Sequence, residues 1–170
     1  MIKINEGIHD RQTVFIHQLE DAGERFFATF DIQLQAAIRR MMPRGAGRIV
    51  NIGSIAGLIV RTKQIAYCAA KAAAIHFTRC LAVEMAPHVI TVHCLCPGMT
   101  HSEMIVQSFA ERGIDLDAAA SLIPTGRLAT GADHAHLVAY FASEEAAHVT
   151  GQVVAVDGGQ SQFLPLPRRS

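Results

Sequence analysis

The chain has no surplus of either charge and no long hydrophobic run. Its 170 residues carry 15 basic and 15 acidic side chains, so the formal net charge is zero. A neutral chain lacks the electrostatic attraction that brings proteins to nucleic acid or to an anionic membrane, and we expect neither partner. No apolar run reaches the ~18 residues of a membrane-spanning helix, and the residues after Met1 do not resemble a secretory signal. We expect a soluble cytoplasmic protein.

The four cysteines lack the spacing of a metal site or of a disulfide framework. Cys94 and Cys96 alternate on a segment typical of a buried strand, and no second Cys-x-x-Cys or His-x-x-x-His set accompanies them. Cys68 and Cys80 lie on one predicted helix, separated by about 18 Å along its axis, which is too far for a disulfide bond. We therefore expect core thiols, no metal and a reducing compartment.

Hydrophobic periodicity divides the chain into alternating helices and strands. With 170 residues, 50% of them hydrophobic, the chain is long enough for one core and too short for two ordinary domains. Strands that alternate with helices indicate an α/β fold with a parallel sheet. The predicted helices are 20–42, 66–86, 102–112, 116–122 and 132–143, and the predicted strands are 48–53, 89–95 and 152–156.

Three residues have the spacing of a proton-transfer site. Tyr67 and Lys71 lie four residues apart in a predicted helix, and Ser54 lies at the end of the preceding predicted strand. Residues at i and i+4 share one helical face, so the Lys71 ammonium would lie beside the phenol and favour its ionised form. Ser54 would hydrogen-bond the same substrate oxygen. The alternative, a core tyrosine and a solvated lysine, is the commoner arrangement when the two helix residues are considered alone.

Further motifs surround these residues in an order typical of one protein family. They are Gly47–Gly57, Tyr67-x-x-x-Lys71, Cys96–Met104, Thr150–Gln152 and Val156–Gly159. With these motifs the chain resembles the short-chain dehydrogenase/reductase family, strongly over about 41–159, weakly over about 24–40 and not over the first twenty or so residues.

The resemblance implies a partial doubly wound, Rossmann-like parallel sheet with flanking helices. It divides the chain into an atypical N-terminal segment, 1–20, the catalytic portion of a Rossmann-like domain, 21–159, and a tail, 160–170. In such open sheets ligands bind at the carboxyl ends of the strands. Both Ser54 and the Pro97-Gly98 pair would lie at that edge.

The resemblance also implies catalytic roles for three residues. Tyr67 would exchange the proton of the substrate hydroxyl, Lys71 would assist the phenol and hold the nicotinamide ribose, and Ser54 would orient the carbonyl. Hydride would pass between the nicotinamide of NAD or NADP and the substrate carbon. The substrate implied is a small alcohol or ketone.

The loop after the predicted strand 89–95 matches a cofactor-binding loop of the family. The resemblance places Pro97, Gly98 and Ser102 against the nicotinamide, with Ser102 near its carboxamide. The alternative is a strand-to-helix turn in which Ser102 caps the next helix. Residues 99–123 resemble the family's variable substrate lid, whose composition suggests an apolar or mixed substrate. Asn51 is interpreted as structural.

Two features of the family are missing. Its members hold the cofactor pyrophosphate on a glycine-rich turn after the first strand, and no such turn precedes Ser54. Against a complete domain roughly eighty residues are absent, including the residue that distinguishes NAD from NADP. Their absence would leave strand 48–53 with an unpaired edge. Many members also carry a helix asparagine that supports a proton path to the lysine, and Phe26 lies near that position here.

Three functions remain open. The first is an oxidoreductase that interconverts hydroxyl and carbonyl groups with NAD or NADP, active alone, in a longer form or with a partner chain. The second is a non-catalytic subunit, because helices 20–42 and 66–86 correspond to surfaces on which family members form homo-oligomers or would join a complementary subunit. The third is a gene fragment that does not fold stably; the intact Ser54, Tyr67 and Lys71 argue against it.

Overall fold

Two buried strands form the centre of the molecule. They are β2 (Gly47–Ile52) and β3 (Ile90–Pro97), and every residue in them except the last is buried. Burial of successive residues means that both faces of each strand are covered, as in parallel sheets with helices on either side. Strand β2 runs parallel to β3 with Ile52 opposite Leu95, so the two strands end together at one edge.

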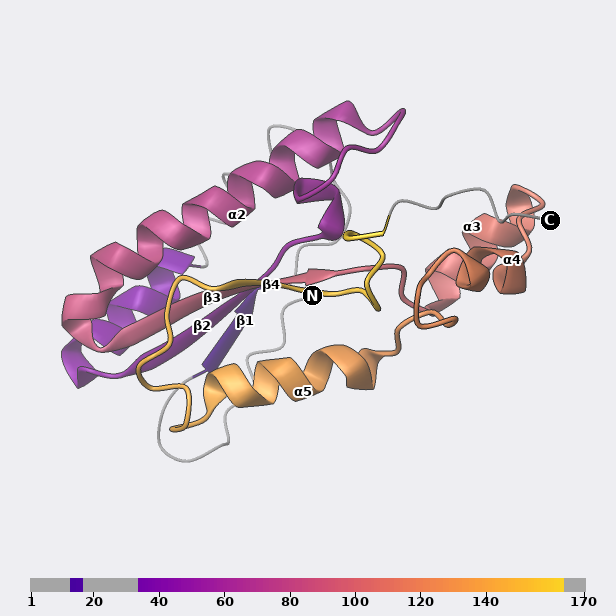
Figure 1. Ribbon diagram of the computed structural model, residues 1–170. Coiled ribbons are helices and arrows are strands. Elements are labelled where there is room, and N and C mark those ends of the chain that lie inside the picture. Colours follow the sequence, from indigo (N-terminus) through magenta and orange to yellow (C-terminus); the bar gives the residue numbers. More distant parts are fainter. Residues whose placement is uncertain (1–12, 17–33, 164–170) are drawn as a thin grey trace.

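The computed structural model describes residues 13–16 and 34–163. Over these residues the sheet has four strands in the order β1-β2-β3-β4, and every neighbouring pair is parallel. Figure 1 shows one long helix, α2, on one face of the sheet and α5 on the other. The predicted α/β fold with flanking helices is confirmed. The outer strands are β1 (Thr13–Ile16) and β4 (Val153–Val156), and the two helices are α2 (Ile65–Met85) and α5 (Gly131–Ala142).

The side chains of β3 alternate between two hydrophobic layers, as the pleat of a strand requires. On one face Val92 packs in a cluster with residues of α2 and of the helix through residues 34–41. On the opposite face Leu95 packs with Val50 of β2 and Phe141 of α5. The two layers hold β2 and β3 between helices and so fix the positions of their carboxyl ends.

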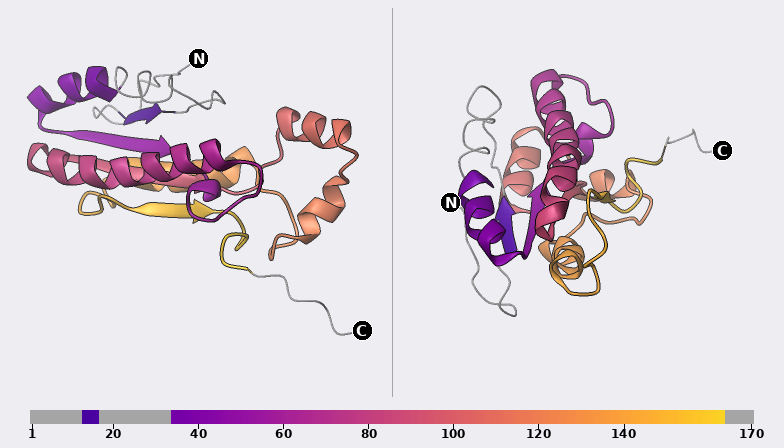
Figure 2. Two further views of the ribbon diagram at one scale, coloured as in Figure 1. Left: turned by 90° about the horizontal axis from the view of Figure 1, so that it is seen from above. Right: turned by 90° about the vertical axis from the view of Figure 1, so that its left-hand side faces the viewer.

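Two short helices lie beyond that carboxyl edge, α3 (Glu103–Glu111) and α4 (Leu116–Ser121). Figure 2 shows them projecting away from the layers formed by α2, the sheet and α5. They belong to the segment 99–123, for which the sequence resemblance predicts a substrate lid; that role stays a prediction.

The predicted and observed element ends differ by no more than two residues for the helices 66–86, 102–112, 116–122 and 132–143 and for the three strands. Of the predicted helix 20–42, residues 34–41 are helical, and the 3-10 turn η1 (Met42–Arg44) follows them. Residues 20–33 of this prediction lie outside the described residues. Proline in η1 ends the helix because its ring cannot continue the hydrogen-bonded backbone.

The predicted unpaired edge of strand 48–53 is wrong. Strand β1 pairs with β2 over four residues, from Thr13 opposite Arg48 to Ile16 opposite Asn51. A four-residue strand is too short for its periodicity to be recognised, although Thr-Val-Phe-Ile is rich in residues that favour strands. The segment 1–20 therefore contributes a strand to the sheet, which the sequence motifs did not indicate.

The cysteines are unpaired, and Cys94 and Cys96 are fully buried with their Sγ atoms 3.9 Å apart. Contact with the Cys94 thiol and burial together raise the pKa of Cys96. Among residues 13–16 and 34–163, no group of three or more His, Cys, Asp or Glu side chains is arranged to hold a metal ion. In the same part of the chain, no helix has the length and apolar character to cross a membrane.

A histidine is buried in the layer beneath α5. His93 on β3 has no exposed surface, and its ring stacks on Phe141 with 3.9 Å between centroids and 6° between planes. Neither ring nitrogen has a hydrogen-bond partner of good geometry among the described residues, although the Val149 backbone lies near enough to oppose a fall in the pKa of the ring. Burial in this apolar layer disfavours the charged ring and lowers the pKa of His93 from 6.5 to about 4.

We expect His93 to make the fold sensitive to acid. The unfolded chain binds a proton at this position below its ordinary pKa of 6.5, whereas the folded chain binds it only near pH 4. Stability is therefore lost as the pH falls from 6.5 toward 4, by roughly 2–3 kcal/mol from this group. Urea unfolding at several pH values should show a steeper loss for the parent chain than for His93→Leu, which cannot titrate. Parallel pH profiles for the two proteins would contradict the assignment.

Candidate active site

A cleft of about 690 Å³ opens at the carboxyl ends of β2 and β3. Residues from β2, α2, the loop after β3 and the start of α5 line it, so segments far apart in the sequence meet there. Lys71 and Arg61 are its cationic lining residues, and none of its described lining residues is Asp or Glu. The lining residues are Ile52, Gly53, Ser54, Ile55, Arg61, Gln64, Tyr67, Lys71, Pro97, Gly98, Met99, Thr100, Ser102, Met104, Ile105 and His134.

Ser54 lies two residues beyond β2 and begins a short 3-10 helix, η2 (Ile55–Gly57). Its Oγ accepts a hydrogen bond from the backbone N–H of Ala56 at 3.1 Å. A serine hydroxyl has one donor proton and two acceptor lone pairs, so this contact leaves the proton for a ligand. The turn thus fixes the side chain at the cleft without using its donor.

Lys71 is held at the floor of the cleft by the strand that Ser54 follows. The side chain is 6% exposed, and Nζ donates to the Ile52 carbonyl at 3.3 Å. Burial lowers the pKa of Lys71, and electrostatic interaction with the neighbouring Cys94 and Cys96 side chains opposes this shift. An ammonium has three donors, so two remain after the bond to Ile52.

Tyr67 and Lys71 lie on one face of α2, as their spacing predicts. Nζ of Lys71 lies over the Tyr67 ring at 5.7 Å from its centroid. Tyr67 is half-buried and lines the cleft, and Ser54 lines it as well. The alternative of a solvated lysine is therefore wrong, because the amine is buried. The assignment of catalytic roles to Ser54, Tyr67 and Lys71 stays a prediction.

The position of α2 relative to η2 depends on a glycine. A Cβ at Gly57 would lie 2.7 Å from the carbonyl carbon of Lys71 and 2.9 Å from the backbone nitrogen of Ala72. These are backbone atoms of a regular helix and cannot move away cheaply. Gly57 therefore allows the turn that carries Ser54 to contact the helix that carries Tyr67 and Lys71.

The predicted cofactor loop also lines the cleft. Gly98 continues from β3 and donates its N–H to Val156 of β4 at 3.1 Å. Ser102 caps α3, because its Oγ accepts from the N–H of Ile105 at 3.3 Å. The helix-cap interpretation of Ser102 is thus correct, and the residue nevertheless lines the cleft together with Pro97 and Gly98. Contact of these three residues with nicotinamide stays a prediction.

Sequence reasoning missed several residues at the cleft. Arg61 and Gln64 lie in the turn between Ser54 and Tyr67, so their place in the chain was a usable signal. Thr100 and His134 also line the cleft, but His134 comes from α5, more than thirty residues further along the chain. No helix or strand periodicity predicts that Thr100 and His134 lie together.

Asn51 has the structural role expected of it. Its Nδ2 donates to Thr78 Oγ1 at 2.9 Å, and Thr78 donates in turn to the Ala74 carbonyl at 2.9 Å. The contact joins β2 to α2 within the core. Phe26, which lies near the position of the family's helix asparagine, is outside the described residues.

The cleft has the donor set that the nicotinamide-ribose part of a dinucleotide requires. A ribose offers hydroxyl groups, which Lys71 Nζ can meet with its two remaining donors, and a carbonyl oxygen can accept from Ser54. The absence of carboxylates among the described lining residues favours an anionic ligand. In the described residues before β2, no glycine-rich turn joins a strand to a helix. The residues present therefore fit the nicotinamide half of such a cofactor.

Comparison with known proteins identifies the family. A family model described as enoyl-(acyl carrier protein) reductase matches residues 27–161. Nodulation protein G of Rhizobium meliloti (strain 1021) is 35% identical over 169 residues, covering 95% of this chain and 66% of that protein. The 3-oxoacyl-(acyl-carrier-protein) reductase FabG of Aggregatibacter actinomycetemcomitans is 41% identical over 123 residues, covering 70% of this chain and 49% of the reductase. The chain belongs to the short-chain dehydrogenase/reductase family.

A solved structure supports the same conclusion at the level of the fold. ElxO with NADP bound superposes with a TM-score of 0.77 at 26% sequence identity, covering 89% of this chain and 67% of ElxO. The chain thus spans about half to two thirds of the length of these relatives. The alignment with nodulation protein G covers 95% of the chain and so reaches into the first twenty residues. The family model, in contrast, begins at residue 27, and the atypical character of residues 1–20 stays a prediction.

We expect Gly57→Ala to destabilise the protein by roughly 1–3 kcal/mol, because the added methyl group would overlap the α2 backbone. The matched control is Gly131→Ala at the start of α5, where a Cβ meets no atom within 4 Å. That change should alter the unfolding free energy by less than about 0.5 kcal/mol. Urea denaturation of the three proteins measures both values. Equal stabilities for the two variants would show that close packing at Gly57 does not hold the site together.

Proposed function

We propose that the chain provides the catalytic half of an NAD- or NADP-dependent oxidoreductase that interconverts a hydroxyl and a carbonyl group. The observation that carries the proposal is the buried Lys71 amine over the Tyr67 ring, with Ser54 on the same cleft. A cation held within reach of a phenol favours transfer of the phenolic proton. A hydroxyl beside them can hydrogen-bond the oxygen that receives it.

Each of the three residues has a separate role in this proposal. In the reducing direction Tyr67 gives its proton to the carbonyl oxygen, while Ser54 donates a hydrogen bond to the same oxygen. Lys71 stabilises the phenolate that remains and binds ribose hydroxyls with its unused donors. Bound NADH or NADPH supplies the hydride that adds to the carbonyl carbon. In the oxidising direction the proton returns to Tyr67.

The relatives support this choice of reaction. FabG is named as a 3-oxoacyl-(acyl-carrier-protein) reductase, and ElxO is described with NADP bound. We propose by this likeness that Pro97, Gly98 and Ser102 contact the nicotinamide and that the substrate is a small alcohol or ketone. The thiols of Cys94 and Cys96, which share a hydrogen bond at 3.9 Å and form no disulfide, are consistent with the proposal of a reducing cytoplasmic location.

The surface of α2 supports a second proposal, that copies of the chain or complementary subunits associate through this helix. Ile65 is 85% exposed and Val83 is 75% exposed, at opposite ends of α2, and Val60 before the helix is 94% exposed. Large apolar side chains exposed along one element indicate a surface that a partner covers. Such a subunit would be active within an assembly or would serve association alone.

We expect the purified chain to bind NADH or NADPH saturably, as followed by nicotinamide fluorescence. Lys71→Met keeps the side-chain volume but removes the ammonium donors, and it should weaken binding by about tenfold or more. Tyr67→Phe should bind within a few-fold of the parent and lose roughly 10²–10⁴-fold in turnover of ketones, since it lacks the proton. Arg79→Ala, on an exposed position of the same helix, is the control and should change neither value.

The outcome that would contradict the catalytic proposal is an absence of binding up to millimolar cofactor in a protein that unfolds cooperatively. Association through α2 would then be the proposal to test, by measuring the mass of the assembly for the parent chain and for Val83→Lys. A monomer in both cases would contradict association between copies of the chain.

A further inference from the structure

The loop after β3 is bound to the segment that leads into α5. Backbone hydrogen bonds run from Ala129 N–H to the Met99 carbonyl at 2.9 Å and from His101 N–H to the Ala129 carbonyl at 2.8 Å. Thr100 forms an isolated parallel bridge with Ala129. The loop 97–102 is therefore attached to the chain that begins α5, in addition to its contacts with β4.

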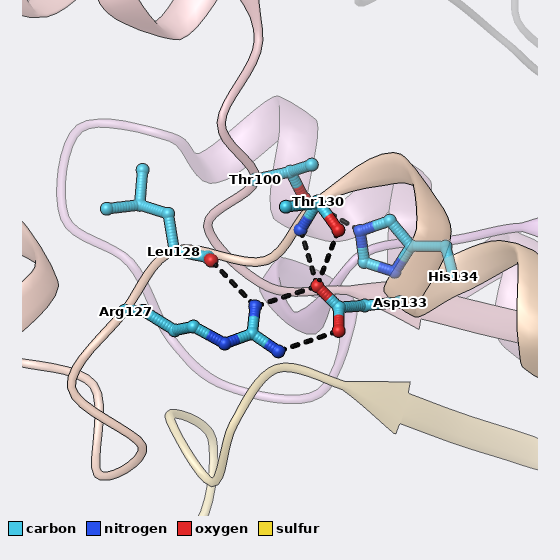
Figure 3. A network of polar contacts seen from close by, with 6 residues as sticks. All are labelled: Thr100, Arg127, Leu128, Thr130, Asp133 and His134. Carbon is cyan, nitrogen blue, oxygen red and sulfur yellow. Dashed lines mark hydrogen bonds and ion pairs between the residues drawn. The ribbon is translucent and has the colours of Figure 1, made fainter.

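A side-chain contact reinforces this attachment at the cleft. Thr100 Oγ1 lies 2.9 Å from His134 Nε2 on the first turn of α5, and both residues line the cleft. Figure 3 shows the imidazole directed at the threonine hydroxyl. The same hydroxyl donates to the Gly98 carbonyl at 3.1 Å. Since a hydroxyl has one proton, Thr100 must accept from His134, which therefore carries its proton on Nε2.

The first turn of α5, which carries His134, is itself held by hydrogen bonds. Asp133 accepts from the backbone N–H of Thr130 at 2.7 Å and from its hydroxyl at 2.8 Å. Both terminal nitrogens of Arg127 donate to the same carboxylate, at 2.8 and 2.7 Å (Figure 3). Hydrogen bonds from Arg127 and Thr130 hold the pKa of Asp133 well below its usual range. The first turn of α5 is thus an ordered support for His134.

A histidine at this position costs free energy of folding that a side chain serving only to fill space would not cost. With the proton on Nε2, Nδ1 is an acceptor, and it is buried without a partner among the described residues. Burial also lowers the pKa of His134 and so favours the neutral ring, although nearby Asp133 opposes this shift. An aliphatic residue would avoid the unpaired acceptor. An aliphatic residue could not, however, donate a hydrogen bond to Thr100.

We propose that His134 is a positioning residue that holds Thr100, and through it the loop 97–102, in the arrangement that the nicotinamide end of the cleft requires. Thr100 is the link, because its hydroxyl joins His134 to the backbone of Gly98 within the loop. The effect on cofactor rests on the function proposed above. The contact between α5 and the loop is independent of that function, and it can be tested without cofactor.

The first measurement is amide hydrogen exchange in the cofactor-free chain, for the parent, His134→Leu, Thr100→Val and the double variant. Loss of the side-chain bond should speed exchange of the protected amides at Gly98 and His101 by about tenfold in each single variant. The double variant should be no worse than Thr100→Val alone, because that change already removes the bond to His134 together with the bond to Gly98. His136→Leu, an exposed position on α5, is the matched control and should exchange as the parent does.

The second measurement is steady-state reduction with NADPH as the varied substrate. His134→Leu should raise KM for NADPH by about five- to tenfold with kcat changed by less than about threefold, and His134→Gln, whose amide can donate to Thr100, should recover most of the loss. If His134 only filled space, His134→Gln would leave KM for NADPH as high as in His134→Leu.

The exchange and kinetic measurements distinguish the positioning role of His134 from the oxidoreductase activity proposed above. Exchange at the loop that is unchanged in His134→Leu, or additive effects in the double variant, would overturn the positioning role of His134 whether or not cofactor binds. Coupled exchange effects with no binding of NADPH by any protein would support the contact between His134 and the loop while removing the oxidoreductase. Coupled exchange with unchanged KM would overturn the part of the proposal that concerns nicotinamide.

Discussion

The cleft exists because α2 can come into direct contact with the turn that follows β2. At Gly57 there is no space for a Cβ between η2 and the Lys71-Ala72 peptide, and Ile55 and Ile75 pack together beside this point. That contact places a helix residue, Lys71, close enough to β2 for its amine to bond the Ile52 carbonyl. Any side chain at residue 57 would move the lysine and tyrosine away from the serine, so the geometry of the three depends on packing outside the cleft.

The second requirement is electrostatic. Burying an amine costs free energy unless polar groups surround it, and here the Ile52 carbonyl and the face of the Tyr67 ring provide the contacts. No carboxylate among the described lining residues neutralises the amine within the cleft. The positive charge of Lys71 can therefore attract an anionic ligand or stabilise a developing phenolate. The opposite wall, the loop 97–102, is fixed separately by β4 and by the start of α5, so the two walls are built from independent contacts.

Local sequence predicted much of this arrangement. Alternating apolar strands and helices gave the parallel sheet and the ends of α2 through α5 to within two residues, and the i, i+4 pair correctly placed Lys71 beside Tyr67. Two parts were not predictable in this way. Strand β1 is four residues long, and its pairing with β2 depends on a partner more than thirty residues away. The contact of Thr100 with His134 likewise joins two segments only through the tertiary fold, so no local pattern reports it.

The most direct test of this account is a ¹⁵N NMR titration of the chain with the two halves of the dinucleotide, nicotinamide mononucleotide and AMP, added separately. The account places a nicotinamide-ribose site at the carboxyl ends of β2 and β3. It predicts saturable shifts with nicotinamide mononucleotide at the amides of Ser54, Tyr67, Lys71 and Gly98, and no comparable shifts there with AMP. Shifts confined to AMP, or shifts with nicotinamide mononucleotide that avoid these four residues, would contradict it.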